Sequence, residues 1–259
     1  MPTISAPQRE TASRFLDANL PPGQVVLCAI TGSHLYGFSS PDSDIDMKGI
    51  HLAPTDALLG LTRPADAHDR LTIFEGVECD LTTHEAGKAM SLLLKGNGNM
   101  LERIFSPLQL VDSPALGELR ALAQGALSRR SLSHYLGFFK GMQRESLRQE
   151  APRAKTLLYS YRVALTGIHL LKTGAVEAHL PTLAAHYGYT EVDELVAIKT
   201  NGTEKGTMPT ADAERFQATW ARLEAALREA AEHSPLPEAP ANTAAVNDWL
   251  VRRRRAALR

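Results

Sequence analysis

Two aspartates stand one residue apart in the stretch TGSHLYGFSSPDSDIDMKGI, which covers residues 31–50. Asp44 and Asp46 flank Ile45 at the start of an expected strand, and side chains two residues apart on a strand point to the same face. Two neighbouring carboxylates repel each other unless a cation or a proton lies between them. The pair therefore indicates a cation site. The alternative is a solvated turn, because SSPDSD is rich in turn residues.

A third carboxylate comes from a different stretch of the chain. Asp80 interrupts an otherwise apolar run at CDL, residues 79–81, where a carboxylate without a partner is costly. A neighbouring strand can deliver it to the face that carries Asp44 and Asp46. Three carboxylates at one sheet edge suit Mg²⁺, with Mn²⁺ as an alternative, and two such ions can activate a hydroxyl and hold a leaving pyrophosphate. The alternative is an aspartate whose hydrogen bonds are satisfied within the core or hairpin.

Gly32 and Ser33 offer hydrogen-bond donors that suit a phosphate, whereas the aspartates suit a cation. A glycine directly after a buried strand lets the backbone approach a phosphate closely, and the amides and hydroxyl that follow can donate hydrogen bonds to it. Gly-Ser is common on its own. The informative feature is the order: a strand, Gly-Ser, a short helix, a turn, Asp-x-Asp on the next strand, and a single Asp on a later strand.

The elements that must position these residues are strands in the first half of the chain. Residues 24–31 form a run rich in β-branched residues between PPG and Gly32, which is typical of a buried strand. Residues 43–53 alternate in polarity, and residues 70–84 are predicted to form a hairpin that turns at Glu75 and Gly76. A further short strand is expected at 108–111. Helical segments in this half are expected at 84–96, 100–107 and 113–127.

The second half of the chain carries helical spacing only. From about Ser131 onward the strand signals stop, and residues 234–242 form a proline-rich spacer before the last helix. Helices are expected at 131–149, 152–174, 191–200, 210–233 and 243–259. The sequence thus predicts an α/β (α+β) fold, with a small mixed-sheet domain over residues 1–128 and an all-helical domain over residues 129–259.

Composition excludes several classes of protein. The 259 residues are 44% hydrophobic and carry a formal net charge of −1, so no overall basic field draws the chain to nucleic acid or membranes. Cys28 and Cys79 lie in apolar runs, which favours buried reduced thiols over a disulfide or a metal clip. The N-terminus lacks the features of a secretory signal, and no apolar run is long enough to span a bilayer. We expect a soluble cytoplasmic protein; its oligomeric state stays open.

These motifs resemble those of the DNA polymerase β-like nucleotidyltransferases, whose signature is Gly-Ser, a gap of about ten residues, Asp-x-Asp and a third Asp on another strand. Three blocks are more closely similar to the RNA-repair-pathway DNA polymerase β family (RlaP). They lie between about residues 25 and 175 and read GSHLYGFSSPDSDIDMKGIHLAP, GNGNMLERIFSP and AKTLLYSYRVALTGIHLLKTG. The last third of the chain carries no motif matched to the family.

The resemblance implies a role for each matched residue. Gly32 and Ser33 become contacts to the nucleotide phosphates, and Asp44 and Asp46 become metal ligands. Asp80 becomes the third catalytic carboxylate, which binds the catalytic metal and accepts or orients the attacking hydroxyl. The implied reaction transfers an NMP from an NTP such as ATP to an acceptor hydroxyl, with Mg²⁺ and release of pyrophosphate. Positioning and charge neutralisation carry such a reaction.

The helical half offers supporting groups. Lys155, Tyr159 and Arg162 have the spacing i, i+4, i+7, so they share one helix face and can point together at a triphosphate or a base. A solvated basic face is the equally weighted alternative. Asn99 and Glu102 fall in a family block, where a substrate contact, a helix cap and an interdomain hydrogen bond stay open. His34 is interpreted as a packed histidine, with a phosphate contact as its alternative.

Charge distribution bears on the acceptor. Residues 129–172 hold nine Lys or Arg against two acids, which suits a phosphate backbone. Interleaved aromatic residues and the RRRR run at 252–255 can add base stacking and a basic patch. Together with the resemblance, this favours RNA as the acceptor. The alternatives are nucleotidyl transfer to a small molecule or a protein side chain, and a catalytically silent module that binds a nucleotide or RNA.

Overall fold

The computed structural model describes residues 4–202 and 206–258, which group into two compact units. The sheet unit contains residues 4–32, 44–127 and 239–258, and the helical unit contains residues 33–43, 128–202 and 206–238. This grouping by spatial contact assigns residues 33–43, 128 and 239–258 differently from the predicted division after residue 128. That division stays a prediction about folding units.

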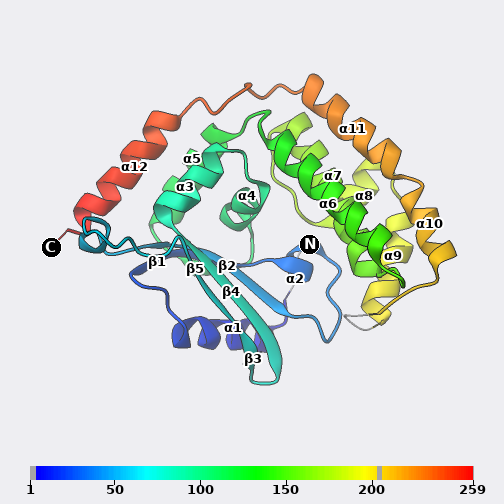
Figure 1. Cartoon of the computed structure of the whole chain (residues 1–259), viewed down its shortest axis with the longest axis horizontal. Helices are drawn as coiled ribbons and strands as arrows, with labels where there is room; N and C mark the ends of the chain where they lie inside the picture. The colour runs from blue at the N-terminus through cyan, green and yellow to red at the C-terminus, as the bar shows by residue number, and fades with distance from the viewer. Residues whose placement is uncertain (1–3, 203–205, 259) are drawn as a thin grey trace. The chain divides into compact units, whose positions relative to one another are not determined.

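The sheet unit is built on five strands in the order β3-β4-β2-β1-β5 (Figure 1). Only the β2 and β4 pair is parallel, and the other three pairs are antiparallel. The sheet is therefore mixed, as the sequence predicts. The strands are β1 (Gln24–Ile30), β2 (Ile45–Leu52), β3 (Ala67–Phe74), β4 (Val77–Glu85) and β5 (Gln109–Asp112).

The hairpin formed by β3 and β4 turns where the sequence predicts it. Glu75 and Gly76 adopt φ angles of 51° and 82°, and two successive residues with positive φ match the twist of the strands that they join. Beyond the turn, burial in β4 alternates strictly, with Cys79 and Leu81 buried and Asp80 partly exposed. One face of this strand therefore belongs to the core and the other does not.

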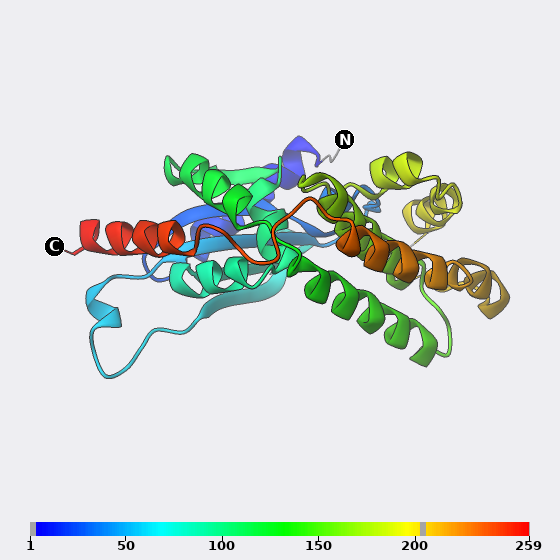
Figure 2. The same ribbon diagram turned by 90° about the horizontal axis from the view of Figure 1, so that it is seen from above.

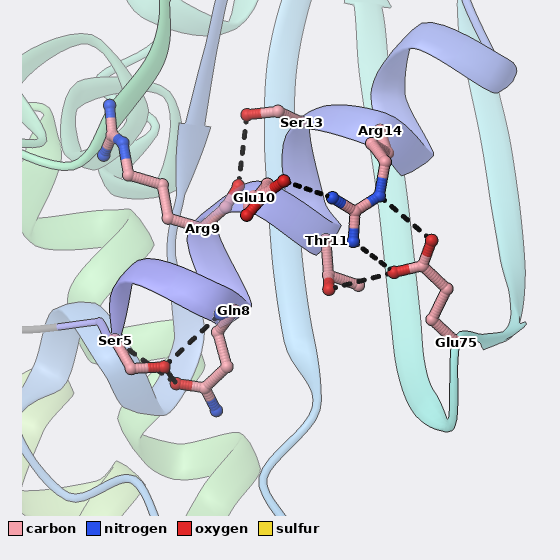
Figure 3. A network of polar contacts seen from close by, with 8 residues as sticks. All are labelled: Ser5, Gln8, Arg9, Glu10, Thr11, Ser13, Arg14 and Glu75. Carbon is pink, nitrogen blue, oxygen red and sulfur yellow. Dashed lines mark hydrogen bonds and ion pairs between the residues drawn. The ribbon is translucent and has the colours of Figure 1, made fainter.

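Helix α1 (Ala6–Ala18) covers one face of the sheet (Figure 1). Its N-terminus carries a capping box between Ser5 and Gln8, and Arg14 holds the β3–β4 turn through two contacts to Glu75, at 3.0 and 2.5 Å (Figure 3). The core beneath this helix contains apolar side chains from the helix and from β1, β2 and β4. Both cysteines lie in that core as free thiols, and burial raises their pKa values, to about 12 for Cys28 and about 11 for Cys79.

The opposite face of the sheet packs against α3 (Ala86–Leu94), α4 (Gly98–Phe105) and α5 (Ala115–Ala126). The last helix, α12 (Thr243–Ala256), packs against α3 and α5, and Figure 2 shows it in red between them. A short 3-10 helix, η1 (Asp56–Leu58), lies in the loop after β2.

The helical unit is organised around α7 (Ala154–Thr173), whose side chains are largely buried. The other described helices of this unit contact it. The helices of this unit are α2 (Gly32–Tyr36), α6 (Ser131–Arg148), α7, α8 (Leu180–Tyr187), α9 (Glu191–Asn201), α10 (Thr210–Gln217) and α11 (Trp220–Glu232). None of the helices among the described residues is long and apolar enough to cross a membrane.

Some expected elements differ in the structure. The single helix expected over residues 210–233 is divided at Ala218 and Thr219 into α10 and α11. The sequence analysis also missed α1 and α8. Helix α1 begins directly after Ser5, and its weak apolar spacing is outweighed by its packing on the sheet.

Candidate active site

Asp46 and Asp80 are direct neighbours in the sheet. Asp46 on β2 and Asp80 on β4 are register partners in the parallel pair, and such partners place their side chains on the same face. The flanking residues Ile45, Met47 and Cys79 are fully buried in the core under α1. The two aspartates therefore lie on the face away from α1. Asp44 immediately precedes β2 and is partly buried.

Gly32 lies tightly against one of these carboxylates. Its φ is +62°, and a Cβ at this position would lie 1.8 Å from Asp46 Oδ2. The preceding residue, Thr31, donates its backbone N–H to the Asp46 carbonyl at 2.8 Å. Both the backbone conformation and the space at residue 32 thus require glycine. The phosphate contact expected for Gly32 stays a prediction.

A lysine that the sequence analysis missed contacts the third carboxylate. Lys48 Nζ lies 2.8 Å from Asp80 Oδ2 and 3.2 Å from Thr82 Oγ1. Lys48 stands two residues after Asp46 on β2, so the period-two alternation that predicts the Asp44 and Asp46 pair also places Lys48 on that face. The signal was present in DMK at residues 46–48.

The donor set suits a magnesium site that is completed by substrate. Within residues 4–202 and 206–258, no three His, Cys, Asp or Glu side chains come together in a group that could hold a metal ion. Mg²⁺ is commonly bound by one or two carboxylates together with substrate phosphates and water. Asp46 and Asp80, side by side on adjacent strands, supply oxygen ligands of that kind.

Ser33 and the loop after it belong to the helical unit. Ser33 is buried, and its carbonyl accepts the backbone N–H groups of Gly37 and Phe38 at 3.0 and 3.1 Å, where α2 ends. His34 is also buried, in agreement with its interpretation as a packed histidine.

The loop that follows α2 is held by a buried lysine. Lys199 of α9, only 2% exposed, donates to Ser40 Oγ at 2.6 Å. The hydroxyl groups of Ser40 and Ser43 lie 3.0 Å apart, and Ser43 Oγ also accepts the Ser40 N–H. This loop leads directly into Asp44. Sequence spacing gave no sign of Lys199, because the contact spans 159 positions in the chain.

The three residues predicted on one face of α7 have different surroundings. Lys155 and Tyr159 are partly exposed, whereas Arg162 is only 1% exposed. The solvated-face alternative is therefore wrong for Arg162. Its guanidinium lies 4.1 Å from the ring centroid of Tyr36 and 5.5 Å from those of Phe138 and Tyr159. We call these four residues the Arg162 cage, a cation–π arrangement.

The alternatives left open in the α4 block are partly resolved. The cap of α4 is Asn97, whose side chain accepts the Met100 N–H at 3.0 Å. Asn99 is exposed, and its backbone carbonyl accepts from Arg103 Nε at 3.3 Å. Glu102 is buried at 2% exposure.

The basic run at 252–255 is only partly available to a partner. Arg253 pairs with Glu118 at 2.8 Å, and Arg254 reaches both carboxylate oxygens of Glu85 at 3.0 Å. These contacts hold α12 within the sheet unit. Arg252 and Arg255 are exposed, so half of the run faces solvent.

Comparison with known proteins identifies the family of this chain. Residues 8–252 match the family described as RlaP, the RNA repair pathway DNA polymerase beta family. The chain belongs to this family. The match extends well beyond the three blocks between about residues 25 and 175, and it includes segments of both units and most of α12. The last third of the chain, in which no motif was identified, is thus part of the family pattern.

Two individual proteins resemble this member of the RlaP family. A protein of Methanocaldococcus jannaschii, named only as uncharacterized, is 26% identical over 223 residues, covering 85% of this chain and 90% of the relative. The crystal structure of a nucleotidyltransferase-like protein from Exiguobacterium sibiricum is 11% identical, with a TM-score of 0.34 over 86% of this chain and 75% of that one. The family match supports nucleotidyl transfer as the general activity.

Proposed function

We propose that this RlaP-family protein is a metal-dependent nucleotidyltransferase that moves an NMP from an NTP to a hydroxyl of RNA and releases pyrophosphate. The observation that carries the proposal is the register pairing of Asp46 with Asp80 on the face of the sheet away from α1. Two carboxylates side by side on adjacent strands repel each other, and a bound divalent cation would relieve the part of that repulsion that the Lys48–Asp80 ion pair leaves.

In this proposal Asp44 and Asp46 hold Mg²⁺ or Mn²⁺, and Asp80 is the third catalytic carboxylate. A bound metal ion would neutralise charge on the triphosphate and lower the pKa of the attacking hydroxyl. Asp80 would bind the catalytic metal and orient that hydroxyl. Gly32 keeps the backbone close to Asp46, so that the carboxylate is held in place. Ser33, Lys155, Tyr159 and Arg162 are proposed contacts to the nucleotide.

RNA is the preferred acceptor because of the charge pattern and the family. Six of the nine basic residues between 129 and 172 are exposed, namely Arg129, Arg130, Arg144, Arg148, Arg153 and Lys172. Lys140 pairs with Glu224 at 3.4 Å. Exposed cations on the helical unit are suited to contact a phosphate backbone. The cytoplasmic location and the repair role stay part of the proposal.

One observation favours a different acceptor. Leu71 on β3 is the register partner of Asp80, and Leu71 and Ile73 are 66% and 72% exposed. Leu71 lies on the same sheet face as the third carboxylate, and an apolar neighbour there suits a small molecule or a protein side chain better than a phosphate backbone. The acceptor experiment must therefore include these classes.

The test is transfer of label from each α-³²P nucleoside triphosphate, with Mg²⁺, to cellular RNA, to protein and to small-molecule pools. Asp44→Ala removes one proposed metal ligand, and Asp17→Asn, on the exposed side of α1, is the matched control. We expect the wild type and Asp17→Asn to label RNA, and Asp44→Ala to label it about 10²-fold less or worse.

The outcomes separate the candidates. Label in another pool would keep the reaction and replace the acceptor. Binding of RNA that weakens steeply between low and moderate salt would support a polynucleotide acceptor, since phosphate contacts release counterions. A protein that binds nucleotide but labels no pool would be the silent module, and the proposed reaction would be wrong.

A further inference from the structure

We propose that Lys48 is a positioning residue for Asp80, and that its ammonium group also weakens metal binding by the carboxylates. The inference rests on the proposed function, because it concerns how the Asp80 carboxylate of that site is held in position. Lys48 acts through Asp80 and not by contact with the reacting atoms.

The first observation is the two-point contact that Lys48 makes on β4. Its Nζ donates to Asp80 Oδ2 at 2.8 Å and to Thr82 Oγ1 at 3.2 Å. Lys48 and Thr82 are themselves register partners in the parallel pair. The ammonium is thus held by groups on a neighbouring strand of the same sheet, which fixes its place better than a single contact from a loop would.

The second observation is the partial burial of this ion pair. The Lys48 and Asp80 side chains are 22% and 36% exposed, whereas those of Lys88 and Asp66, a Lys–Asp pair in the same unit, are 39% and 71% exposed. Asp66 lies in a loop and Lys88 makes one contact to it, at 3.0 Å. Pairs that are shielded from water interact more strongly than exposed ones. Lys88 therefore provides a matched control for Lys48.

The charges explain why this contact matters for a metal site. Asp80 adds a negative charge beside Asp46, and the Lys48 ammonium offsets that added charge. With Oδ2 engaged by the ammonium, Asp80 offers its Oδ1 to a metal ion or to an acceptor hydroxyl. The carboxylate is held in one orientation before substrate arrives, as a preorganised site requires.

This arrangement predicts opposite effects on binding and on turnover. Removing the ammonium leaves a more negative site, so a divalent cation should bind more tightly. The same change releases the Asp80 carboxylate, so the chemical step should slow. A lysine that served only to stabilise the sheet would not produce this combination.

The experiment compares the full-length wild type with Lys48→Met, Lys48→Arg and Lys88→Met. Mn²⁺ binding is measured by electron paramagnetic resonance without nucleotide, and label transfer is measured at saturating metal. We expect Lys48→Met to bind Mn²⁺ about tenfold more tightly and to lower kcat by about 10²-fold with little change in KM for the nucleotide. Lys48→Arg should restore the wild-type Mn²⁺ affinity and part of kcat, and Lys88→Met should match the wild type.

Unchanged or weaker Mn²⁺ binding by folded Lys48→Met would overturn the proposal, as would wild-type turnover. If Lys48→Met does not fold, Lys48→Arg provides the test, because it keeps the positive charge but changes the length and shape of the side chain. Wild-type metal binding with a lower kcat would then support a positioning role. An unchanged kcat would argue against it. Failure of the proposed function is a different result, because then the wild type transfers no label to any pool, while the Mn²⁺ titration still reports on Lys48.

Discussion

The sheet unit and the helical unit hold the charged residues of the proposed site in opposite ways. In the sheet unit, Asp46 and Asp80 are partly exposed on one face of adjacent strands, and Asp80 pairs there with Lys48. In the helical unit, Arg162 is buried, and its guanidinium is surrounded by the rings of Tyr36, Phe138 and Tyr159. One unit presents charge at a surface, and the other encloses it.

This difference separates residues that can bind a ligand directly from residues that first hold the fold. A carboxylate on a strand face can accept a metal ion without disturbing the core. A buried guanidinium in a cation–π cage is more costly to disturb. Removing it takes away the attraction between the cation and the surrounding rings, and it leaves buried groups without their partner. Substitutions in the two units should therefore fail for different reasons.

The largest expected effect is on activity, in the sheet unit. Gly32→Ala adds a Cβ that would lie 1.8 Å from Asp46 Oδ2, at a residue with φ of +62°. The Asp46 carboxylate must move, and a displacement of about 1 Å in a catalytic group can lower the rate by about 10²-fold. Label transfer and Mn²⁺ affinity are the measurements, and we expect both to fall.

The matched control is Gly117→Ala, an exposed glycine of α5 whose Cβ would meet nothing within 4 Å. It should keep full activity and gain about 0.5–1 kcal/mol of stability, as alanine does in a helix. Full activity in Gly32→Ala would show that Asp46 can shift without consequence, and the assignment of Asp46 as a metal ligand would then be wrong.

A smaller effect is expected in the helical unit, and it should appear first as lost stability. Arg162→Met keeps an apolar stem but removes the cation from the three rings, which should lower the free energy of unfolding by about 2 kcal/mol. Urea denaturation followed by circular dichroism measures it. Arg228→Met is the control, because Arg228 is about half exposed and bonds to Glu224 one turn away. Its effect should stay within about 0.5 kcal/mol.

The same variant tests the proposed nucleotide contact. If Arg162→Met leaves the unfolding transition unchanged and raises KM for the nucleotide, the cage is a binding element and the contrast between the units fails. If stability falls and KM is unchanged after the folded fraction is taken into account, the cage is structural.

The sequence predicted the features that depend on neighbours within a few residues. Strand alternation located the aspartates and the hairpin turn at Glu75 and Gly76, because a period of two is visible in any short segment. The same rule would have found Lys48. The buried state of the cysteines also followed from the apolar runs that contain them.

The features that were missed depend on contacts between distant parts of the chain. Burial of Arg162 depends on the packing of Tyr36 and Phe138 around it, and these come from other helices. Similarly, Arg254 pairs with Glu85 across 169 positions, which brings the last helix to the sheet unit. A helical pattern shows which side of a helix is apolar, but it does not show which segment will cover that side.

The smallest effect is a dependence of stability on pH that arises from His84 on β4. Burial, followed by the charge of Arg103, lowers the pKa of His84 from its ordinary value of 6.5 to about 4. Arg103 donates to His84 Nδ1 at 3.0 Å, so this ring nitrogen acts as an acceptor. Because the folded protein takes up this proton only near pH 4, whereas the unfolded chain takes it up near 6.5, stability is full above pH 6.5 and decreases as the pH falls towards 4. For this part-exposed ring we expect a loss on the order of 1 kcal/mol.

Urea denaturation at several pH values measures how the free energy of unfolding changes with pH. The wild type should show this decrease towards pH 4, and His84→Gln should show a smaller one. His233→Gln, at an exposed site, should behave as the wild type. Equal slopes for the wild type and His84→Gln would assign the acid sensitivity to other groups, and the contact between Arg103 and His84 would then have no role in it.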